Sequence, residues 1–349
     1  LFAVPLPLPL AGNRGCDLTP PPACEPGAEE TLACECEAEL QRTCDERGAW
    51  GEWDGDCELL CEGVTGDCEN GDQAQRERWL PGLIKGELIG CFGLTEPDFG
   101  SNPAGLRATA RRDGASFVIN GTKRWITNGS SADLALVFAR DDDGRLAGFL
   151  VERGAPGFET REIEGKLSLR ASPTGELIFD DCRVPAENRL PGAVGLKPVL
   201  STLSEARYGI AWGVVGAAKA CFFEALDYAG ERVQFDRPIA GFQLVQHKLA
   251  EIYGEIVEAE LLCLRLAQLK QAGRLHHVAL SVAKRNNVAM ALRAARAARE
   301  ILGANGIVDD YCPMRHACNL ESVATYEGTH DIHTLVIGQA LTGHSAFTG

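Results

Sequence analysis

The segment TYEGTHDIH, residues 325–333, brings several side chains capable of chemistry together near the C-terminal end of the chain. Glu327 could act as a general base, because a carboxylate accepts protons and burial raises its pKa. It could equally be a solvated charge at the end of a helix. His330 and His333 could belong to a surface turn or to a weak metal site. These nine residues alone leave all of these alternatives open.

Two segments nearer the middle of the chain could hold a ligand. The loop CFGLTEPDFGS, residues 91–101, can turn backbone N–H groups and hydroxyls such as that of Ser101 toward a bound molecule. It lacks the ending of a P-loop and is not a dinucleotide fingerprint. In GTKRWITNG, residues 121–129, Trp125 and Thr127 share one face of an expected strand. The indole could be part of a core or a platform for a flat cofactor.

The elements that position these residues change in kind along the chain. Residues 88–197 contain short β-rich runs separated by turn signals, which predicts an antiparallel barrel or sandwich. From residue 198 to 349, apolar residues recur at steps of three and four in four long stretches, approximately 198–231, 242–271, 276–303 and 319–347. This pattern favours an antiparallel four-helix bundle. We therefore expect an α+β multidomain protein.

Residues 1–72 have a different composition from the rest. They hold 17 acidic and 3 basic residues, whereas the remainder holds 32 and 31. Eight of the 14 cysteines also lie there, at positions 16, 24, 34, 36, 44, 57, 61 and 68. We expect an acidic segment that is poorly ordered or stapled by disulfides. A zinc site is less favoured, because the segment has no histidine and no paired CxxC motifs.

Several classes of function are disfavoured by composition. The chain beyond residue 72 is nearly neutral, so it offers no basic surface for nucleic acid. No stretch approaches 18 uninterrupted apolar residues, so we expect no membrane span. The opening LFAVPLPLPLAGN could be the tail of a signal peptide, although it has no basic start. A secreted Cys-rich binding module is thus an alternative for residues 1–72.

From residue 72 to 349 the chain resembles the acyl-CoA dehydrogenase family, and within it the glutaryl-CoA dehydrogenases. WITN and the YEGT-type segment are typical of the whole family. SLRAS (168–172), ARYGIAWG (206–213) and THDIH (329–333) point to the glutaryl branch. The resemblance implies a middle β-domain over 88–197 and a C-terminal helical bundle over 198–349. Residues 73–87 would be a short helix left from an N-terminal α-domain that is otherwise missing.

The resemblance also implies a role for individual residues. Glu327 would be the catalytic base. Arg232 and Gln243 would hold the FAD of a neighbouring subunit. The full set of residues that would bind FAD is Phe92, Leu94, Thr95, Ser101, Trp125, Ile126, Thr127, Arg232, Gln243, Glu300, Leu302, Gly303 and Thr329. Those that would contact the acyl-CoA are Ser101, Arg207, Tyr208, Gly328 and Phe347. No metal is expected.

The reaction implied is α,β-dehydrogenation of an acyl-CoA thioester with FAD as cofactor. In the glutaryl branch the product also loses CO₂, giving crotonyl-CoA in lysine and tryptophan degradation. Electrons would pass to electron-transfer flavoprotein, and the enzyme would be a homotetramer in the cytoplasm or the mitochondrial matrix. The arginine and serine that recognise the distal carboxylate belong to the missing α-domain. A dehydrogenase that does not decarboxylate, or an inactive remnant, is therefore the alternative.

Overall fold

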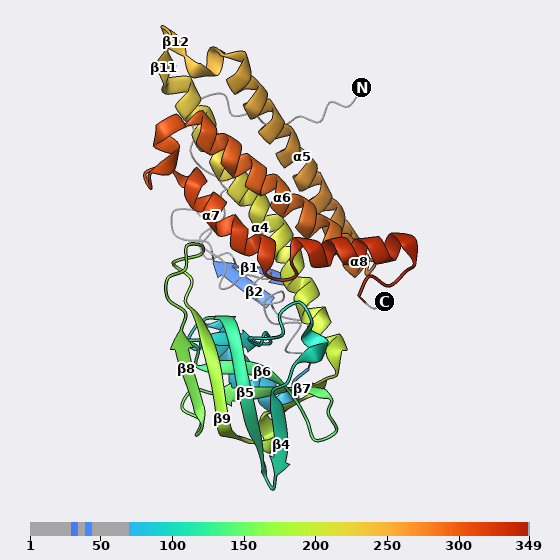
Figure 1. Cartoon of the computed structure of the whole chain (residues 1–349). Helices are drawn as coiled ribbons and strands as arrows, with labels where there is room; N and C mark the ends of the chain where they lie inside the picture. The colour runs from blue at the N-terminus through green and yellow to red at the C-terminus, as the bar shows by residue number, and fades with distance from the viewer. Residues whose placement is uncertain (1–28, 34–38, 44–69, 348–349) are drawn as a thin grey trace. The chain divides into compact units, whose positions relative to one another are not determined.

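The computed structural model describes residues 29–33, 39–43 and 70–347 (Figure 1). The chain divides into two compact units, Leu1–Thr65 and Gly66–Gly349. In the first unit, β1 (Glu29–Ala33) pairs antiparallel with β2 (Glu39–Thr43). The eight cysteines expected to staple residues 1–72 lie outside the described residues, so that prediction stays untested.

The second unit begins with a short helix and continues into a β-domain. Helix α3 (Gln73–Ile84) starts at Asp72, whose carboxylate accepts the Gln75 N–H while the Gln75 side chain accepts the Asp72 N–H. The strands that follow are β3 (Gly90–Gly93), β4 (Thr109–Asp113), β5 (Ser116–Thr127), β6 (Leu134–Arg140), β7 (Leu146–Glu152), β8 (Phe158–Glu162), β9 (Thr174–Pro185) and β10 (Arg189–Val194).

These eight strands form one sheet in the order β10-β7-β6-β4-β5-β9-β8, with β3 pairing to β6. Most pairs are antiparallel, as the sequence predicted, but β3 and β4 both run parallel to β6. Buried apolar side chains pack in two clusters, one containing Ile119 and Phe149 and the other Leu106 and Phe138. Three short 3₁₀ helices (Pro103–Gly105, Ala186–Asn188, Ile239–Gly241) connect the larger elements.

The C-terminal part is helical and contains α4 (Leu196–Glu231), α5 (Gln243–Gln271), α6 (His277–Ile301), α7 (Cys312–Thr325) and α8 (His330–Thr342). Helices α4, α5, α6 and α7 lie side by side in a bundle, and α8 runs at a steep angle to them (Figure 1). A small hairpin of β11 (Val233–Gln234) and β12 (Arg237–Pro238) joins α4 to α5, and a 3₁₀ turn (Gly303–Ile307) follows α6.

The prediction of a fourth long helix over approximately residues 319–347 is wrong in one respect. The structure divides the C-terminal region into α7 and α8, because residues 326–329 leave the helical conformation. Glu327 and Gly328 both have positive φ angles, of 52° and 92°, which an α-helix cannot contain. Glu327 therefore lies at the corner between two helices rather than on a helix face.

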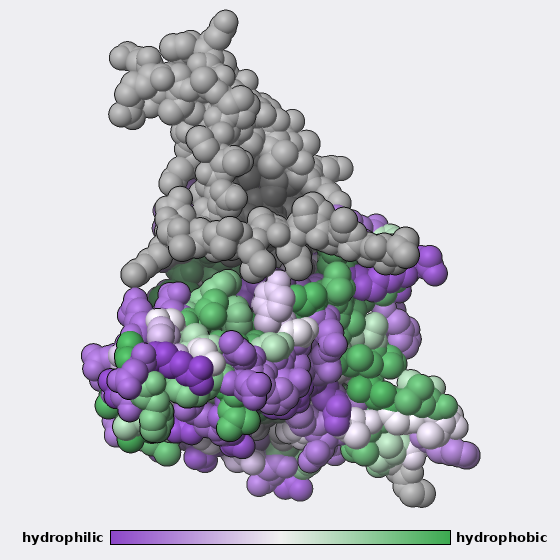
Figure 2. Space-filling view, turned by 90° about the horizontal axis from the view of Figure 1, so that it is seen from above, coloured by the Kyte–Doolittle hydropathy of each residue, from purple (hydrophilic) through white to green (hydrophobic). Residues whose placement is uncertain are grey.

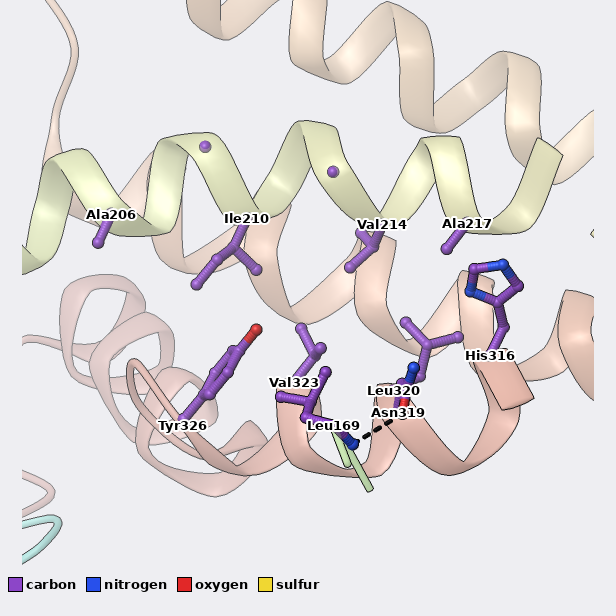
Figure 3. A pocket seen from close by; sticks show the side chains of 12 residues that line it. Leu169, Ala206, Ile210, Val214, Ala217, His316, Asn319, Leu320, Val323 and Tyr326 are labelled. Atoms are coloured by element: carbon purple, nitrogen blue, oxygen red, sulfur yellow. Dashed lines mark hydrogen bonds between the residues drawn. The ribbon is translucent and has the colours of Figure 1, made fainter. Parts of the chain in front are cut away.

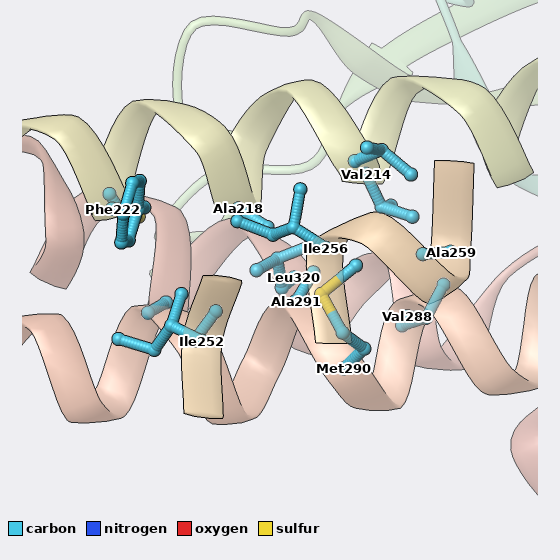
Figure 4. Packing of buried hydrophobic residues seen from close by; sticks show 14 of the residues in the cluster. Val214, Ala218, Phe222, Ile252, Ile256, Ala259, Val288, Met290, Ala291 and Leu320 are labelled. Atoms are coloured by element: carbon cyan, nitrogen blue, oxygen red, sulfur yellow. The ribbon is translucent and has the colours of Figure 1, made fainter. Parts of the chain in front are cut away.

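The bundle core is built from small and branched side chains. Figure 4 shows Val214, Ala218 and Phe222 of α4 packed against Ile252 and Ile256 of α5 and residues of α6. By length and composition α4 could cross a membrane, but one face of it is buried against the other helices of this bundle. A helix in the core of a helical bundle can have the same length and the same apolar composition.

The middle domain and the bundle are joined by specific hydrogen bonds within the second unit. The backbone N–H of Leu169 donates to Asn319 Oδ1 at 2.7 Å, and Ser168 Oγ lies 2.5 Å from Ser322 Oγ. The loop after β8 thus contacts α7 two turns before Glu327. Asn319 and Ser322 fix the end of α7 relative to the sheet.

Large apolar side chains remain exposed on several elements of the bundle. In the view of Figure 2, hydrophobic residues lie in patches between hydrophilic ones. Leu244, Leu261 and Leu264 on α5 and Phe223 on α4 are each at least half exposed. Large exposed apolar patches mark interaction sites or ligand-binding grooves in many proteins.

Candidate active site

The corner between α7 and α8 holds Glu327 in a backbone conformation that its neighbours enforce. Tyr326 ends α7, and Thr329 begins α8 by accepting the Ile332 N–H on its hydroxyl at 3.1 Å. A Cβ on Gly328 would lie 2.8 Å from His333 Nε2, so only glycine fits there. The corner combines two left-handed residues and a close backbone approach, a combination typical of functional loops.

Two cations hold the three successive carbonyls of this corner. Lys284, a fully buried residue of α6, donates through Nζ to Tyr326 O at 2.9 Å and to Gly328 O at 2.8 Å. Arg207 of α4 donates through Nε to Glu327 O at 2.9 Å. Hydrogen bonds from charged donors are the stronger kind. The corner is therefore fixed from α4 and from α6 at once.

Burial controls the acid–base character of the corner. It raises the pKa of Glu327 above the usual carboxyl range, and the Arg207 and Lys284 charges act in the opposite direction. Burial likewise lowers the pKa of Lys284 to about 8, against the attraction of Glu327. Among the described residues nothing hydrogen-bonds to the buried Oε2 atom of Glu327. A buried carboxylate with an unused oxygen and a raised pKa is suited to take a proton from a ligand.

The two histidines of the segment are not charged partners of Glu327. His333 is fully buried, and burial lowers its pKa to about 4, so the ring is neutral at pH 7. Burial also lowers the pKa of His330. Neither ring belongs to a cluster of potential metal ligands among the described residues. His333 instead fills the space beneath Gly328.

A cavity of about 490 Å³ lies between α4 and α7 beside the corner. Figure 3 shows Ala206, Ile210 and Val214 of α4 facing Val323 of α7 and the ring of Tyr326 across it. Gly209 and Gly213 leave the α4 wall without side chains. This lining is mostly apolar and would suit an alkyl chain or an apolar helix face.

A second part of the site lies on the β-domain, where β5 ends. Trp125 has a φ of 62° and is 56% exposed, whereas its neighbour Ile126 is buried. The pairing of β5 with β9 shifts register between Lys123 and Ile126, which re-aims the side chains there. Thr127 is exposed like Trp125. An indole held outward by a strained backbone is a platform for a flat ligand.

A buried ion pair ties this strand to the preceding loop. Lys123 Nζ donates to Glu96 Oε1 at 2.9 Å and to Leu94 O at 3.2 Å, and both side chains are nearly inaccessible to solvent. Glu96 also accepts the N–H groups of Arg107 and Ala108. The Arg124 N–H donates to the Thr95 carbonyl at 2.8 Å. The loop at 94–96 and the strand at 123–125 thus form one unit.

The remaining residues predicted to bind FAD fall in two places. Phe92, Leu94 and Thr95 lie on or just after β3, and Ser101 is exposed in the loop that follows. The others gather around the end of the bundle that carries β11 and β12, away from α8 (Figure 1). These are Arg232 after α4, Gln243 at the start of α5, and Glu300, Leu302 and Gly303 at the end of α6.

The structure therefore does not bring all the predicted residues together in one chain. Glu327, Gly328, Thr329 and Arg207 form one cluster, whereas the Arg232 group lies at the other end of the bundle. The expectation that Arg232 and Gln243 hold the FAD of a neighbouring subunit stays a prediction. Glu300 pairs there with Lys248 at 2.7 Å.

Two predicted substrate contacts lie outside that cluster. The Tyr208 ring lies 4.7 Å below Lys270 Nζ. Phe347 is exposed in the last described residues. Among the described residues, no contact joins Tyr208 or Phe347 to Glu327.

The sequence analysis missed the buried charged residues that fix the backbone around the site. Lys284 and the Glu96–Lys123 pair were assigned no role. The sequence could have indicated Lys284. This residue of AKRNN lies between apolar residues, on the helix face whose apolar residues recur at the spacing of the bundle core. Lys123 likewise falls among alternating core positions of β5. A lysine at a core position implies a partner, because burying an unpaired charge is costly.

Comparison with known proteins identifies the family of this chain. Residues 91–182 match the family model described as acyl-CoA dehydrogenase, middle domain, and residues 194–342 match acyl-CoA dehydrogenase, C-terminal domain. The chain is 36% identical over 277 residues to the short-chain specific acyl-CoA dehydrogenase of Megasphaera elsdenii, covering 78% of this chain and 72% of that protein.

Solved structures give closer matches. A crystal structure of glutaryl-CoA dehydrogenase from Mycobacterium smegmatis is 51% identical, with a TM-score of 0.81 over 84% of this chain and 76% of that one. A second, of a glutaryl-CoA dehydrogenase from the same organism in complex with FADH2, is 50% identical with a TM-score of 0.80, over 82% and 74%. The fold and site thus define a flavoenzyme-type oxidoreductase scaffold. The chain belongs to the acyl-CoA dehydrogenase family.

Proposed function

We propose that this chain catalyses FAD-dependent α,β-dehydrogenation of an acyl-CoA thioester, with glutaryl-CoA as its substrate. The observation that carries the proposal is Glu327, whose half-buried side chain has a raised pKa and whose buried Oε2 atom has no hydrogen-bond partner among the described residues. Abstraction of a proton next to a thioester carbonyl needs such a base, since the proton is weakly acidic. Arg207 and Lys284 keep the carboxylate at one place by holding its backbone.

The residues present fit an FAD molecule. Trp125 offers an exposed indole on a left-handed backbone, and Thr127 presents a hydroxyl on the same strand. Arg232 and Gln243 are exposed at the far end of the bundle, where a guanidinium can pair with the phosphates of a neighbouring subunit's cofactor. When bound, FAD supplies the hydride acceptor of the reaction. The related structure with FADH2 supports this assignment.

The protein's own residues would act on the proton and on the acyl chain. Glu327 takes the α-proton, and its raised pKa makes it a stronger base than a solvated carboxylate. The mostly apolar cavity beside Tyr326 would accept the alkyl part of the acyl chain. Ser101, Arg207, Tyr208, Gly328 and Phe347 remain the proposed contacts to the acyl-CoA.

Glutaryl-CoA is preferred because two related structures that bear that name are 51% and 50% identical to this chain. The product of dehydrogenation would then lose its distal carboxylate as CO₂, giving crotonyl-CoA. A short-chain acyl-CoA such as butyryl-CoA is the second candidate, since the Megasphaera elsdenii relative is described as short-chain specific. The two differ in whether CO₂ is released.

A substrate screen tests the proposal. Purified protein reconstituted with FAD would be assayed for dye reduction with glutaryl-, butyryl- and isovaleryl-CoA, and for CO₂. Dye reduction with CO₂ from glutaryl-CoA supports the proposal, whereas reduction by butyryl-CoA alone supports the short-chain alternative. Bound FAD without turnover on any ester would identify an inactive remnant. Failure to bind FAD would contradict the assignment as a whole.

Assembly and electron transfer are part of the same proposal. We expect a homotetramer, supported by the exposed leucines of α5 and by the Arg232 group, which lies at the other end of the bundle from Glu327. Electron-transfer flavoprotein would be the acceptor. A compartment that holds CoA esters, the cytoplasm or the mitochondrial matrix, is expected. Light scattering of the FAD-loaded protein tests the assembly.

A further inference from the structure

A cluster of metal-ligating side chains lies at the other end of α7 from Glu327. The sulfur atoms of Cys221 and Cys312 and a ring nitrogen of His316 all lie within 4.8 Å of one another. Cys221 is fully buried, and the other two are half-buried. Three donors this close, contributed by two helices, match the donor types of a zinc site.

The sequence spacing explains why these side chains meet. Cys221 and Glu224 are three apart on α4, and Cys312 and His316 are four apart on α7, so each pair shares one helix face. Two donors at such spacing on each of two packed helices is how helix bundles build metal sites. The pairs are separated by about 90 residues in the sequence, so sequence inspection did not join them.

We propose that Cys221, Cys312 and His316 bind a zinc ion that joins the start of α7 to α4. Glu224 lies outside that three-residue cluster but is our candidate for the fourth ligand, because its Oε2 atom accepts the Cys312 N–H at 2.7 Å. Zinc takes four ligands in tetrahedral geometry, and thiolate, imidazole and carboxylate are its usual protein donors. Nothing in the acyl-CoA reaction proposed above uses these four residues.

A bound zinc ion would hold both cysteines as thiolates, because ligand thiols release their protons when they bind a metal. Two thiolates and Glu224 would leave the zinc site with one negative charge, close to the positive Arg315.

The position of the cluster suggests what the ion would do. His316 also lines the cavity between α4 and α7, together with Ala217 of α4 (Figure 3). Cys312 is the first residue of α7, and the same helix ends at the Glu327 corner. A metal at this point would therefore fix one end of the helix whose other end carries the catalytic base. It would act as a structural staple and not as a catalyst.

Cobalt(II) binding to the full-length protein tests the proposal. Protein stripped of metal would be titrated with Co²⁺, and thiolate-to-cobalt absorption would be followed. The eight cysteines of residues 1–72 are present in every variant, so only differences between variants count. We expect Cys312→Ser and His316→Ala to lose one equivalent of Co²⁺ relative to wild type. Cys318→Ser, on the same helix but outside the cluster, should lose none.

Thermal unfolding gives an independent readout if a variant folds poorly. Zinc should raise the Tm of the wild type and of Cys318→Ser, but not that of Cys312→Ser. Glu224→Gln, which replaces the candidate fourth ligand by a neutral amide, should bind Co²⁺ at least roughly 10-fold more weakly, since losing even a residue that only supports a ligand costs that much. Equal Co²⁺ binding by wild type and Cys312→Ser, or an equal zinc effect on their Tm values, would overturn the site.

Discussion

Lys284 and Glu327 are joined through the backbone rather than through their side chains. The Lys284 ammonium donates to the carbonyls of Tyr326 and Gly328, the two residues that flank Glu327. The lysine is fully buried and thus acts as a fixed positive charge beneath the corner. It both positions the carboxylate and lowers its pKa, opposing the effect of burial. Removing the lysine should therefore alter the pH dependence of the catalytic rate and not only the magnitude of that rate.

We expect Lys284→Met to move the acid limb of the pH–rate profile to higher pH. Catalysis needs ionised Glu327, so the rate falls as pH drops through the pKa of that carboxyl. Loss of the lysine charge removes one of the two effects that lower this pKa, so it rises further. The pH dependence of kcat/KM for the best substrate measures the shift. Lys197→Met, an exposed lysine of α4, is the control and should leave the profile in place.

The same variant should change how stability depends on alkaline pH. Burial lowers the pKa of Lys284 to about 8 in the folded protein, below the ordinary value of 10.5. Between these two pH values the unfolded chain binds more protons at this residue than the folded protein does. The contribution of Lys284 to the free energy of unfolding therefore rises with pH. The unfolding free energy of wild type minus that of Lys284→Met should therefore increase from pH 8 toward 10.5. A flat difference would show that Lys284 titrates as a solvated lysine.

Glu327→Gln should separate catalysis from folding. Loss of a positioned base costs about 100- to 10,000-fold in rate, so kcat should fall in that range while FAD content stays the same. A buried ionised carboxylate of raised pKa destabilises the folded state, and neutral glutamine removes that cost. The variant should therefore be as stable as wild type or more stable at pH 7, and most clearly so as pH rises. Unchanged turnover would sink the assignment of the base.

Much of the fold was readable in the sequence, because long apolar periodicity and turn-separated β-runs report burial directly. The three helices α4, α5 and α6 fell where the pattern placed them. The break between α7 and α8 was not predicted. Glu327 has no intrinsic preference for positive φ, and its conformation depends on contacts with Lys284 and Arg207 from distant parts of the chain.

The candidate site was predicted from resemblance and only partly from residue chemistry. Glu327 was singled out because a carboxylate beside glycine and a hydroxyl can act as a base. The spatial separation of Arg232 from Glu327 could not follow from spacing alone, since it depends on helix direction in the bundle. The metal-ligand cluster was missed for the same reason. Cys221 and His316 meet only once α4 and α7 are packed together.

Gly328→Ala should cost more stability than a matched change elsewhere. Gly328 and Gly343 both have positive φ, of 92° and 75°, so alanine strains the backbone at each by roughly 1–2 kcal/mol. At Gly328 the added Cβ would also meet the buried His333 ring at 2.8 Å, whereas at Gly343 nothing lies within 4 Å. Denaturant unfolding should show the larger loss for Gly328→Ala, together with a fall in kcat. Equal losses would mean that the His333 ring moves freely.

The buried pair of Glu96 and Lys123 should connect stability to FAD retention. Glu96→Gln leaves Lys123 buried without its counter-ion, and breaking a buried pair in this way costs about 3–5 kcal/mol. The loss should shrink at low pH. Burial alone would raise the pKa of Glu96, but hydrogen bonds from Arg107 and Ala108 N–H groups and from Lys123 lower it, so its stabilising effect fades as pH falls below the ordinary carboxyl range.

FAD retention should follow, because the pair joins the loop carrying Thr95 to the strand carrying Trp125. We expect Glu96→Gln to release FAD at a lower temperature than wild type, followed by flavin fluorescence. Asp113→Asn breaks the exposed pair with Arg183 on the same sheet and should cost less than about 1 kcal/mol, with no change in FAD release. If both variants lost FAD alike, the effect would come from the charge of the β-domain and not from the buried pair.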